Sequence, residues 1–275
     1  IDEASQMKPE QAFSLIARCK QIIIVGDQKQ LPPSSRFEKD YSSDEILEDD
    51  VDVEYSESIL ELADKVIGSK NALSLGWHYR SKHTSLIDFS NYYFYDNKLT
   101  VFASNDVGSK VVHKPVENSQ YRGGVNRPEV KAVIDALLEQ IKSDNEKSII
   151  IATMNQQQEA EVNLELEAEF KNNKMLRDFD NKHQGTLNEL AVKKLEDIQG
   201  DERDVVIIST VYGPDADGKI TQMFGDINRA NGHRRLNVLF TRAKHKVILV
   251  TSLRSSNIKE SKREGPQILK KYLEY

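Results

Sequence analysis

The sequence predicts an α/β protein built around a parallel β-sheet. Runs rich in isoleucine and valine, at 21–25, 148–153 and 205–209, have the length and composition of strands that are buried on both faces. Segments with a helical spacing of apolar residues alternate with these runs. Such alternation is typical of βαβ units, in which the strands are parallel. The 275 residues suit one large domain or one and a half.

The composition narrows the class of protein. Hydrophobic residues make up 38% of the chain, which is enough for a real core and excludes wholesale disorder. The net charge of -6 does not exclude a nucleic-acid partner, because such binding depends on local basic clusters. Cys19 is the only cysteine, so an intrachain disulfide is impossible and a reducing cytoplasm is the expected compartment. No apolar run approaches ~20 residues and no signal peptide precedes Ile1, so no membrane association is expected.

The first third of the chain is expected to contain two helices and two strands. Pro9 stands early in a short amphipathic helix. The run 21–25 ends in Gly-Asp, which favours a buried parallel strand that leads into a polar loop. The range 38–57 is dominated by Asp and Glu and predicts a flexible acidic insertion. The other elements expected here are a capped helix from Ser56 to Ile67 and a short strand from Leu73 to Leu75.

The remainder of the chain continues the alternation. Pro128 begins a strongly amphipathic helix. The range 98–124 predicts only short strands and loops, and the range 171–188 is polar without a clear pattern. The other expected elements are helices over 83–95, 155–171, 234–243 and 267–275, and strands over 148–153, 205–209 and 246–251.

Two adjacent carboxylates stand near the beginning, in the segment Ile1-Asp2-Glu3-Ala4-Ser5-Gln6. At the end of a buried strand, Asp2 could hold Mg²⁺ through water and Glu3 could orient an attacking water molecule. The alternative is a solvated pair with no chemical role. Gln30 follows in a loop that Pro32 and Pro33 stiffen, and it is either part of a rigid turn or a sensor of a terminal phosphate.

Three further residues have either a functional or a purely structural interpretation. Arg80 is flanked by Trp77 and Tyr79, so it is either a surface cation or an arginine that faces a cleft. Thr153 and Gln158 stand at a predicted strand-to-helix turn. Hydroxyl and amide groups in such a turn bind phosphate backbones, and they are also ordinary residues for the beginning of a helix.

Five stretches, taken in order, resemble the motifs of superfamily 1 helicases. Residues 2–6 are similar to the Walker B motif and residues 26–33 to motif III. Residues 79–80 resemble motif IV, residues 199–204 motif V and residues 236–243 motif VI. The match covers nearly the whole chain. It is closest to the Upf-like branch, and in particular to bacterial helicase-like proteins that often carry a further restriction-endonuclease-like domain.

The resemblance implies a P-loop NTPase fold and a motor that moves along single-stranded DNA or RNA. ATP and Mg²⁺ would bind in a cleft between two RecA-like domains. The implied roles are Mg²⁺ binding for Asp2, polarisation of the attacking water for Glu3, contact with the γ-phosphate for Gln30, and arginine fingers for Arg80 and Arg242.

Other residues of the same motifs are expected to contact the nucleotide or the nucleic acid. Gln199, Gly200 and Glu202 would line the nucleotide, with Glu202 as the ribose ligand. Thr153 and Gln158 resemble contacts of the second domain with the nucleic-acid backbone. Arg203 and Arg235 are expected to be structural or surface cations.

The sequence departs from the helicase pattern in one large respect. No Gly-Lys-Ser or Gly-Lys-Thr occurs in it, so the phosphate-binding loop of these enzymes is not among the 275 residues. We therefore expect residues 1–72 to be the C-terminal part of a first RecA-like domain and residues 73–275 to be a complete second one. The N-terminal part of the helicase is then a required partner, and the chain alone is expected to be inactive.

Two other functions compete with the motor. The chain could be a non-hydrolysing module that binds nucleic acid or protein on a helicase-like fold. It could also be a metal-dependent nuclease that uses Asp2, Glu3 and the acidic insertion, but no further carboxylate stands at a convincing spacing. The choice between DNA and RNA, and the direction of movement, stay open.

Overall fold

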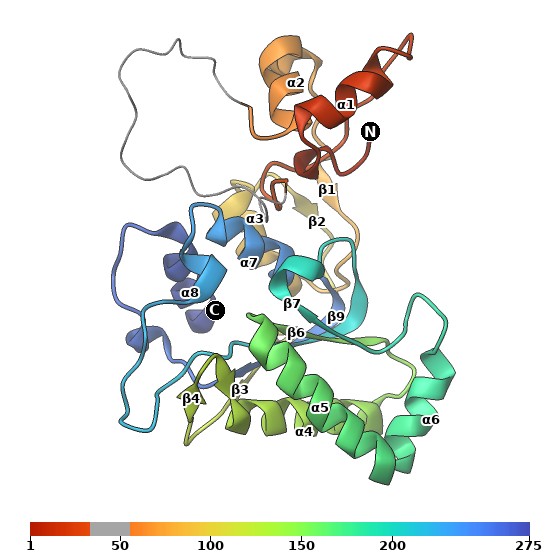
Figure 1. Ribbon diagram of the computed structural model, residues 1–275. Helices are drawn as coiled ribbons and strands as arrows, with labels where there is room; N and C mark the ends of the chain where they lie inside the picture. Colours follow the sequence, from red (N-terminus) through yellow and green to blue (C-terminus); the bar gives the residue numbers. More distant parts are fainter. Residues whose placement is uncertain (34–55) are drawn as a thin grey trace. The chain divides into compact units, whose positions relative to one another are not determined.

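The computed structural model describes residues 1–33 and 56–275, and it divides the chain into two compact units, Ile1–Leu75 and Gly76–Tyr275 (Figure 1). The assignment of residues 1–72 and 73–275 to two RecA-like domains stays a prediction. The predicted acidic insertion, 38–57, lies almost wholly outside the described residues. Within the described ranges, no helix has the length and apolar character that crossing a membrane would require.

The first unit is built from two short helices, α1 (Pro9–Ile16) and α2 (Ile59–Ile67). Proline stands in the first turn of α1, where its missing N–H costs nothing. At α2, the Ser58 hydroxyl caps the helix by accepting from the Glu61 amide at 3.2 Å. Both predicted helices are confirmed. Ala4, Ala12 and Ile59 form the buried centre of the unit. The unit also contains two short 3₁₀ turns, Ala4–Gln6 and Ser69–Asn71.

The predicted buried strand at 21–25 is wrong. Backbone bonds join it to the first residues in the pattern of a parallel pair, with Ile1 N donating to Ile23 O and Val25 N donating to Ile1 O, both at 2.8 Å. The pairing is too short to form a strand. Ile24 packs on the core, but Ile23 and Val25 are 69% and 47% exposed, because the unit covers only one face of this segment. The strand expected at 73–75 is also absent from the structure, which leaves Leu73 and Leu75 exposed.

The second unit contains a five-stranded, fully parallel sheet in the order β3-β9-β8-β6-β7. The predicted α/β class with a parallel sheet is therefore confirmed. β8 is the central strand, and it pairs with β6 on one side and β9 on the other. The strands are β3 (Val111–Pro115), β6 (Ile149–Thr153), β7 (Ala191–Lys194), β8 (Arg203–Ser209) and β9 (Ala243–Thr251).

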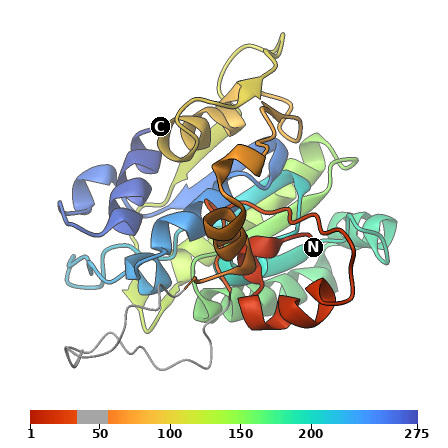
Figure 2. The same ribbon diagram turned by 90° about the horizontal axis from the view of Figure 1, so that it is seen from above.

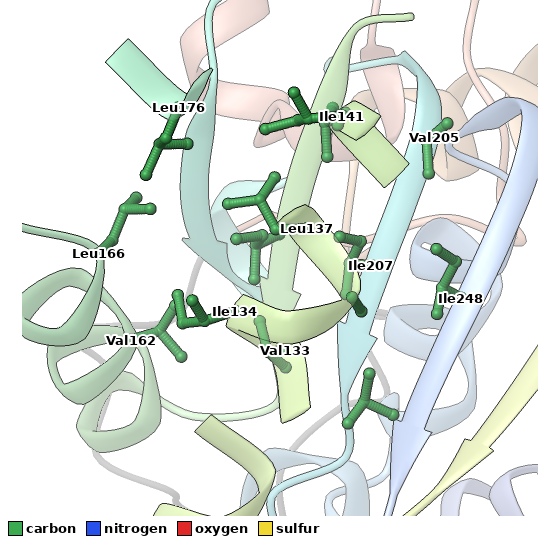
Figure 3. Close-up of a cluster of buried hydrophobic side chains, with 14 of the residues drawn as sticks. Val133, Ile134, Leu137, Ile141, Val162, Leu166, Leu176, Val205, Ile207 and Ile248 are labelled. Carbon is green, nitrogen blue, oxygen red and sulfur yellow. The ribbon is translucent and has the colours of Figure 1, made fainter. Parts of the chain in front are cut away.

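Helices cover both faces of this sheet. One face is covered by α4 (Arg127–Ser143), α5 (Gln156–Asn172) and α6 (Lys174–His183). Their apolar side chains interdigitate with those of β8 and β9, as Figure 3 shows for Leu137, Ile207 and Ile248. Burial of these side chains is the main stabilising contribution of this layer.

The opposite face carries α3 (Asp88–Phe94), α7 (Gly232–Phe240) and α8 (Glu264–Glu274), and Figure 2 views the unit from this side. An aromatic cluster joins the three helices. The Phe240 and Tyr272 rings stack at a centroid distance of 3.4 Å, and Phe89 contacts both rings edge-on. Such pairs add stability beyond their buried area.

Two elements that border the main sheet and its helical layer, α6 and β7, were not predicted from the sequence. The range 171–188 contains α6, whose buried side chains are few (Leu176, Phe179 and His183). β7 is an edge strand of four half-buried residues, two of them lysines, so it lacks the apolar run of an interior strand.

The second unit also contains short elements. They are β1 (Trp77–His78), β2 (Thr100–Val101), β4 (Tyr121–Arg122), β5 (Val125–Asn126), and 3₁₀ turns at Thr84–Leu86, Leu195–Asp197, Gly225–Asn228 and Ser255–Asn257.

The turn after β1 is fastened to the beginning of β9 through a neutral histidine. His78 Nε2 accepts from the Ser81 amide at 3.0 Å, and the Ser81 hydroxyl donates to the Ala243 carbonyl at 3.3 Å. Burial, together with the nearby charges of Arg80 and Arg242, lowers the pKa of His78 to about 4. An imidazole that accepts through Nε2 and whose pKa is lowered in this way is uncharged at neutral pH.

We predict that His78 makes the stability of the protein decrease in mild acid. Its folded-state pKa lies below the unfolded value of 6.5, so the unfolded chain gains a proton that the folded chain resists as the pH falls from about 6.5 to 4. Replacing His78→Gln keeps an acceptor and removes the titration. The loss of unfolding free energy between pH 7 and pH 5 should shrink by about 1 kcal/mol, a value that allows for solvent screening of a half-buried group.

Urea unfolding at the two pH values checks this expectation. An unchanged dependence in the His78→Gln variant would contradict the assignment.

Candidate functional site

The carboxylate segment of the first unit lies beside the loop that contains Gln30. The Ala4 amide donates to the Val25 carbonyl at 2.9 Å, which brings the two segments together. Gly26 permits this approach, because a Cβ atom there would lie 2.9 Å from Ser5 N and 3.1 Å from Ala4 N. The structure thus places Asp2 and Glu3 on one of two adjacent loops and Gln30 on the other.

Glu3 adopts a left-handed backbone conformation with φ of 50°. This conformation is uncommon for a residue other than glycine, and such residues concentrate at functional sites. The Glu3 amide donates to Asp2 Oδ1 at 2.9 Å, and Glu3 Oε2 accepts from Gln6 Nε2 at 3.2 Å. Asp2 and Glu3 are both exposed, so the turn presents two neighbouring carboxylates at the surface of the unit.

Asp27 organises the loop of Gln30. Its Oδ1 atom accepts from the Lys29 amide at 2.8 Å, and its Oδ2 atom accepts from Gln30 Nε2 at 3.1 Å. The Gln30 side chain is therefore oriented by the carboxylate that ends the 21–27 segment. The rigidity expected of this loop rests on these bonds as well as on its prolines.

In the second unit, three charged side chains meet at the amino ends of β8 and β9. Glu202 accepts from Arg80 Nε at 2.8 Å through one oxygen, and its other oxygen lies 2.8 Å from Lys244 Nζ. Hydrogen bonds from Lys244 and Arg80 lower the pKa of Glu202 to about 2, so the carboxylate is charged throughout the neutral range. Charged hydrogen bonds of this kind fix the plane of the Arg80 guanidinium.

Arg242 lies next to this group but points inward. Only 2% of the residue is exposed, and its Nε atom donates to the Val238 carbonyl at 2.8 Å. A second, longer bond runs from Nη1 to the Asp201 carbonyl at 3.4 Å. Arg80 Nη1 donates to the carbonyl of Thr241, the residue before Arg242. The structure therefore brings Arg80, Glu202 and Arg242 together. Their shared role in one nucleotide site stays a prediction.

Gln199 and Gly200 form the loop that enters β8. Gly200 has φ of 86° and is exposed, and this backbone conformation favours glycine. Gln199 is half-buried. The next residue, Asp201, holds the loop from two sides, since its carbonyl accepts from Arg242 and its carboxylate pairs with Lys193 at 2.6 Å.

Thr153 and Gln158 lie at the opposite end of the strands, which we call the carboxyl edge of the sheet. Thr153 ends β6, and Gln158 is in the first turn of α5. Both are fully buried. Gln158 binds both backbone groups of Asn126 and donates to Ser209 Oγ at 3.1 Å. Direct contact of these two side chains with nucleic acid would require the turn to open, and in this structure they hold the edge in shape.

Sequence patterns did not single out Lys244 or Glu129. Lys244 directly follows motif VI and looks like one more exposed lysine. Glu129 occupies the first turn of α4, where an acidic residue is expected for helix-dipole reasons alone, yet it is fully buried. Burial raises the pKa of the Glu129 carboxyl, against the effect of the hydrogen bonds that it accepts. No local signal in the sequence distinguishes it from a surface acid.

Comparison with known proteins shows the family. Residues 105–254 match the AAA_12 family, whose description is "AAA domain". The chain is 34% identical over 289 residues to the "Uncharacterized ATP-dependent helicase MG140 homolog" of Mycoplasma pneumoniae, and 33% identical over 288 residues to the corresponding Mycoplasma genitalium protein. Each alignment covers 100% of this chain and 25% of the relative.

More distant relatives have similar names. The mouse "Probable helicase senataxin" is 27% identical, over 93% of this chain and 9% of that protein. A solved C-terminal domain of a possible DNA helicase from a Lactobacillus has 15% identity and a TM-score of 0.32, over 63% of this chain and 88% of that domain.

The chain spans about a quarter of the length of the two Mycoplasma relatives. The resemblance to the C-terminal part of superfamily 1 helicases is confirmed by the family match and by these relatives. The family match extends over more than half of the sequence, through motifs V and VI. The chain therefore belongs to the AAA_12 family of AAA domains and is a helicase-like region of superfamily 1.

Proposed function

We propose that the chain forms part of the motor of an ATP-dependent helicase or translocase that moves along single-stranded DNA or RNA. The observation that carries the proposal is the group of Arg80, Glu202, Lys244 and Arg242 at the amino ends of β8 and β9. Two arginines suit the recognition of a nucleoside triphosphate, because guanidinium groups match phosphate geometry, and the neighbouring ionised carboxylate can orient them. Relatives named as ATP-dependent helicases support the same function.

The first unit would supply the hydrolytic groups. Glu3 would accept a hydrogen bond from the attacking water and orient it in line with the γ-phosphate. Gln30, which Asp27 holds in place, would bind the γ-phosphate and lose that contact after hydrolysis. The loss of one hydrogen bond on a stiffened loop is a signal that can be passed to the rest of the protein.

Asp2 fits a site for Mg²⁺. Its carboxylate is exposed, and one of its oxygens is oriented by the Glu3 amide. In the described ranges, no group of three or more His, Cys, Asp and Glu residues is placed to hold a metal. Magnesium sites in ATPases need only one or two carboxylates, because phosphate and water complete the shell. A magnesium ion bound there would neutralise negative charge on the phosphates.

The second unit would stabilise charge on the transferring phosphoryl group. Arg80 is held by Glu202 and is 23% exposed at its side chain, so its remaining N–H groups can bind equatorial oxygens. Glu202 would then position Arg80 in addition to contacting the ribose. For Arg242, the same role requires that its guanidinium exchange backbone carbonyls for phosphate oxygens. Gln199 and Gly200 would line the nucleotide.

The carboxyl edge of the sheet would bind the nucleic-acid strand. Exposed arginines lie near it in β4, at the beginning of α4 and after β9, namely Arg122, Arg127 and Arg254. Thr153 and Gln158 would shape this edge from within. Binding through phosphate contacts should weaken steeply as salt is added.

We predict that Glu3→Gln in the full-length protein abolishes strand-stimulated ATP turnover and spares ATP binding. The amide keeps the size of the side chain but cannot accept the water proton in the same way, so turnover should fall at least ~100-fold. Phosphate release and equilibrium binding of a fluorescent ATP analogue measure the two quantities. Glu10→Gln, an exposed position on α1, is the control and should behave as wild type. Wild-type turnover in Glu3→Gln would contradict the role of Glu3.

A second prediction concerns Arg80. Arg80→Ala removes an arginine finger, and such residues contribute ~10³–10⁵ in rate in related systems, so turnover should fall by several hundredfold or more. Folding should persist, because Glu202 keeps its pair with Lys244. Arg263→Ala, at an exposed position before α8, is the matched control. A loss of turnover of less than tenfold, with the fold intact by circular dichroism, would remove Arg80 from the site.

A third prediction separates the motor from a non-hydrolysing interaction module. The 275 residues contain no phosphate-binding loop, so this chain alone should hydrolyse no ATP, with or without single-stranded DNA or RNA. The full-length protein should hydrolyse ATP in the same assay. Turnover by the chain alone would overturn the assignment as part of a motor, and inactivity of both would favour the interaction module.

A further inference from the structure

Glu129 is a buried carboxylate that four donors surround at the carboxyl edge of the second unit. Its Oε2 atom accepts from Ser209 Oγ and from the Val211 amide, both at 2.6 Å. Its Oε1 atom accepts from Thr210 Oγ1 at 3.1 Å and from the Ser252 amide at 2.7 Å. The carboxylate thereby joins the end of β8 to the end of β9. Burying a carboxylate is costly unless hydrogen bonds compensate for its lost hydration, and these four bonds provide that compensation.

The Glu129 carboxylate binds the amide of Val211, a residue with an unusual backbone conformation. Its φ is 69°, and the Tyr212 amide donates to the Thr210 carbonyl at 2.7 Å across it. A positive φ with a bond between residues two apart is the rare, strained form of the γ-turn. Val211 is β-branched and fully buried, so this conformation is a genuine outlier for it. The amide that donates to Glu129 belongs to this strained residue.

The turn determines where the chain leaves the sheet. Directly after it, Gly213 lies so close to its neighbours that a Cβ atom would be 2.4 Å from Ser119 Oγ and 2.7 Å from Ser252 Cβ. Asn126 donates to both of these serine hydroxyls at 3.0 Å. The path of residues 211–213 is thus fitted to the segments that form the rest of the edge.

We propose that Glu129 is a positioning residue that holds the strained turn at Val211 and so sets the shape of the carboxyl edge along which nucleic acid binds. The part about nucleic acid rests on the proposed function. The part about the turn rests only on the contacts of Glu129. Glu129 itself is buried and would not contact the nucleic acid.

Relief of the strain provides a sharp test. Glu129→Gln removes the charge and two of the acceptor positions, so the turn should lose its conformation. Val211→Gly makes the same backbone conformation free of strain, because glycine adopts positive φ readily. Val211→Ala is the matched control, since it removes side-chain atoms but keeps the penalty. If Glu129 serves to hold the turn, Val211→Gly should rescue Glu129→Gln and Val211→Ala should not.

The measurement is the affinity of the full-length protein for a fluorescent single-stranded oligonucleotide, as DNA and as RNA, at fixed salt. Glu129→Gln should weaken binding about tenfold, at the lower end of what a strained residue is worth. The double variant with Val211→Gly should return to within about threefold of wild type. Equal affinity of Glu129→Gln and wild type, or equal rescue by glycine and alanine, would overturn the proposal.

Unfolding by urea of the same variants keeps the two proposals apart. The midpoint of Glu129→Gln should rise when Val211→Gly is added, whether or not the protein binds nucleic acid. If wild type binds no oligonucleotide but this rescue of the midpoint occurs, the proposed function fails and the turn assignment stands. If Glu129→Gln does not fold, the yield of folded protein is the quantity that glycine should restore and alanine should not.

Discussion

The pairing of β8 on both sides is the constraint on which the second unit depends. β8 lies between β6 and β9 in a parallel ladder whose members are almost completely buried. Because all strands of a parallel sheet run in one direction, residues at the beginning of the strands and residues at their ends lie on opposite sides of the sheet. Glu202 precedes β8 and pairs with Arg80, whereas Ser209 ends β8 and donates to Glu129. One buried strand of seven residues thus separates two chemically different regions and fixes their spacing.

Much of the fold could be predicted from the sequence, because its elements have local signatures. The strands β6 and β8 are unbroken apolar runs, and α4 has a regular apolar stripe. The element α6 escaped prediction since it buries only three side chains. The segment 21–25 has the composition of a buried strand, but its environment depends on which layers cover it, and composition does not contain that information.

The candidate site could be predicted only in part. Arg80 and Arg242 were recognisable from motifs, and the structure brings them together. Their partner Lys244 and the network of Glu129 were not, because they depend on contacts between residues far apart in the chain, 82 positions in the case of Val211 and Glu129. Thr153 and Gln158 illustrate the reverse case. Their residue types suit a phosphate ligand, but only the structure shows that both amide hydrogens of Gln158 and its oxygen take part in internal hydrogen bonds.

The one-sided covering of residues 21–25 has a practical consequence for handling the protein. Among the described residues, the backbone of this segment pairs only with residues 1–4, and two of its large apolar side chains are exposed. An extended, isoleucine-rich segment with an open edge is a template on which another chain can add a strand. Preparations of the chain by itself should therefore aggregate as concentration rises, and a charged substitution at Ile23 is the simplest way to keep them in solution.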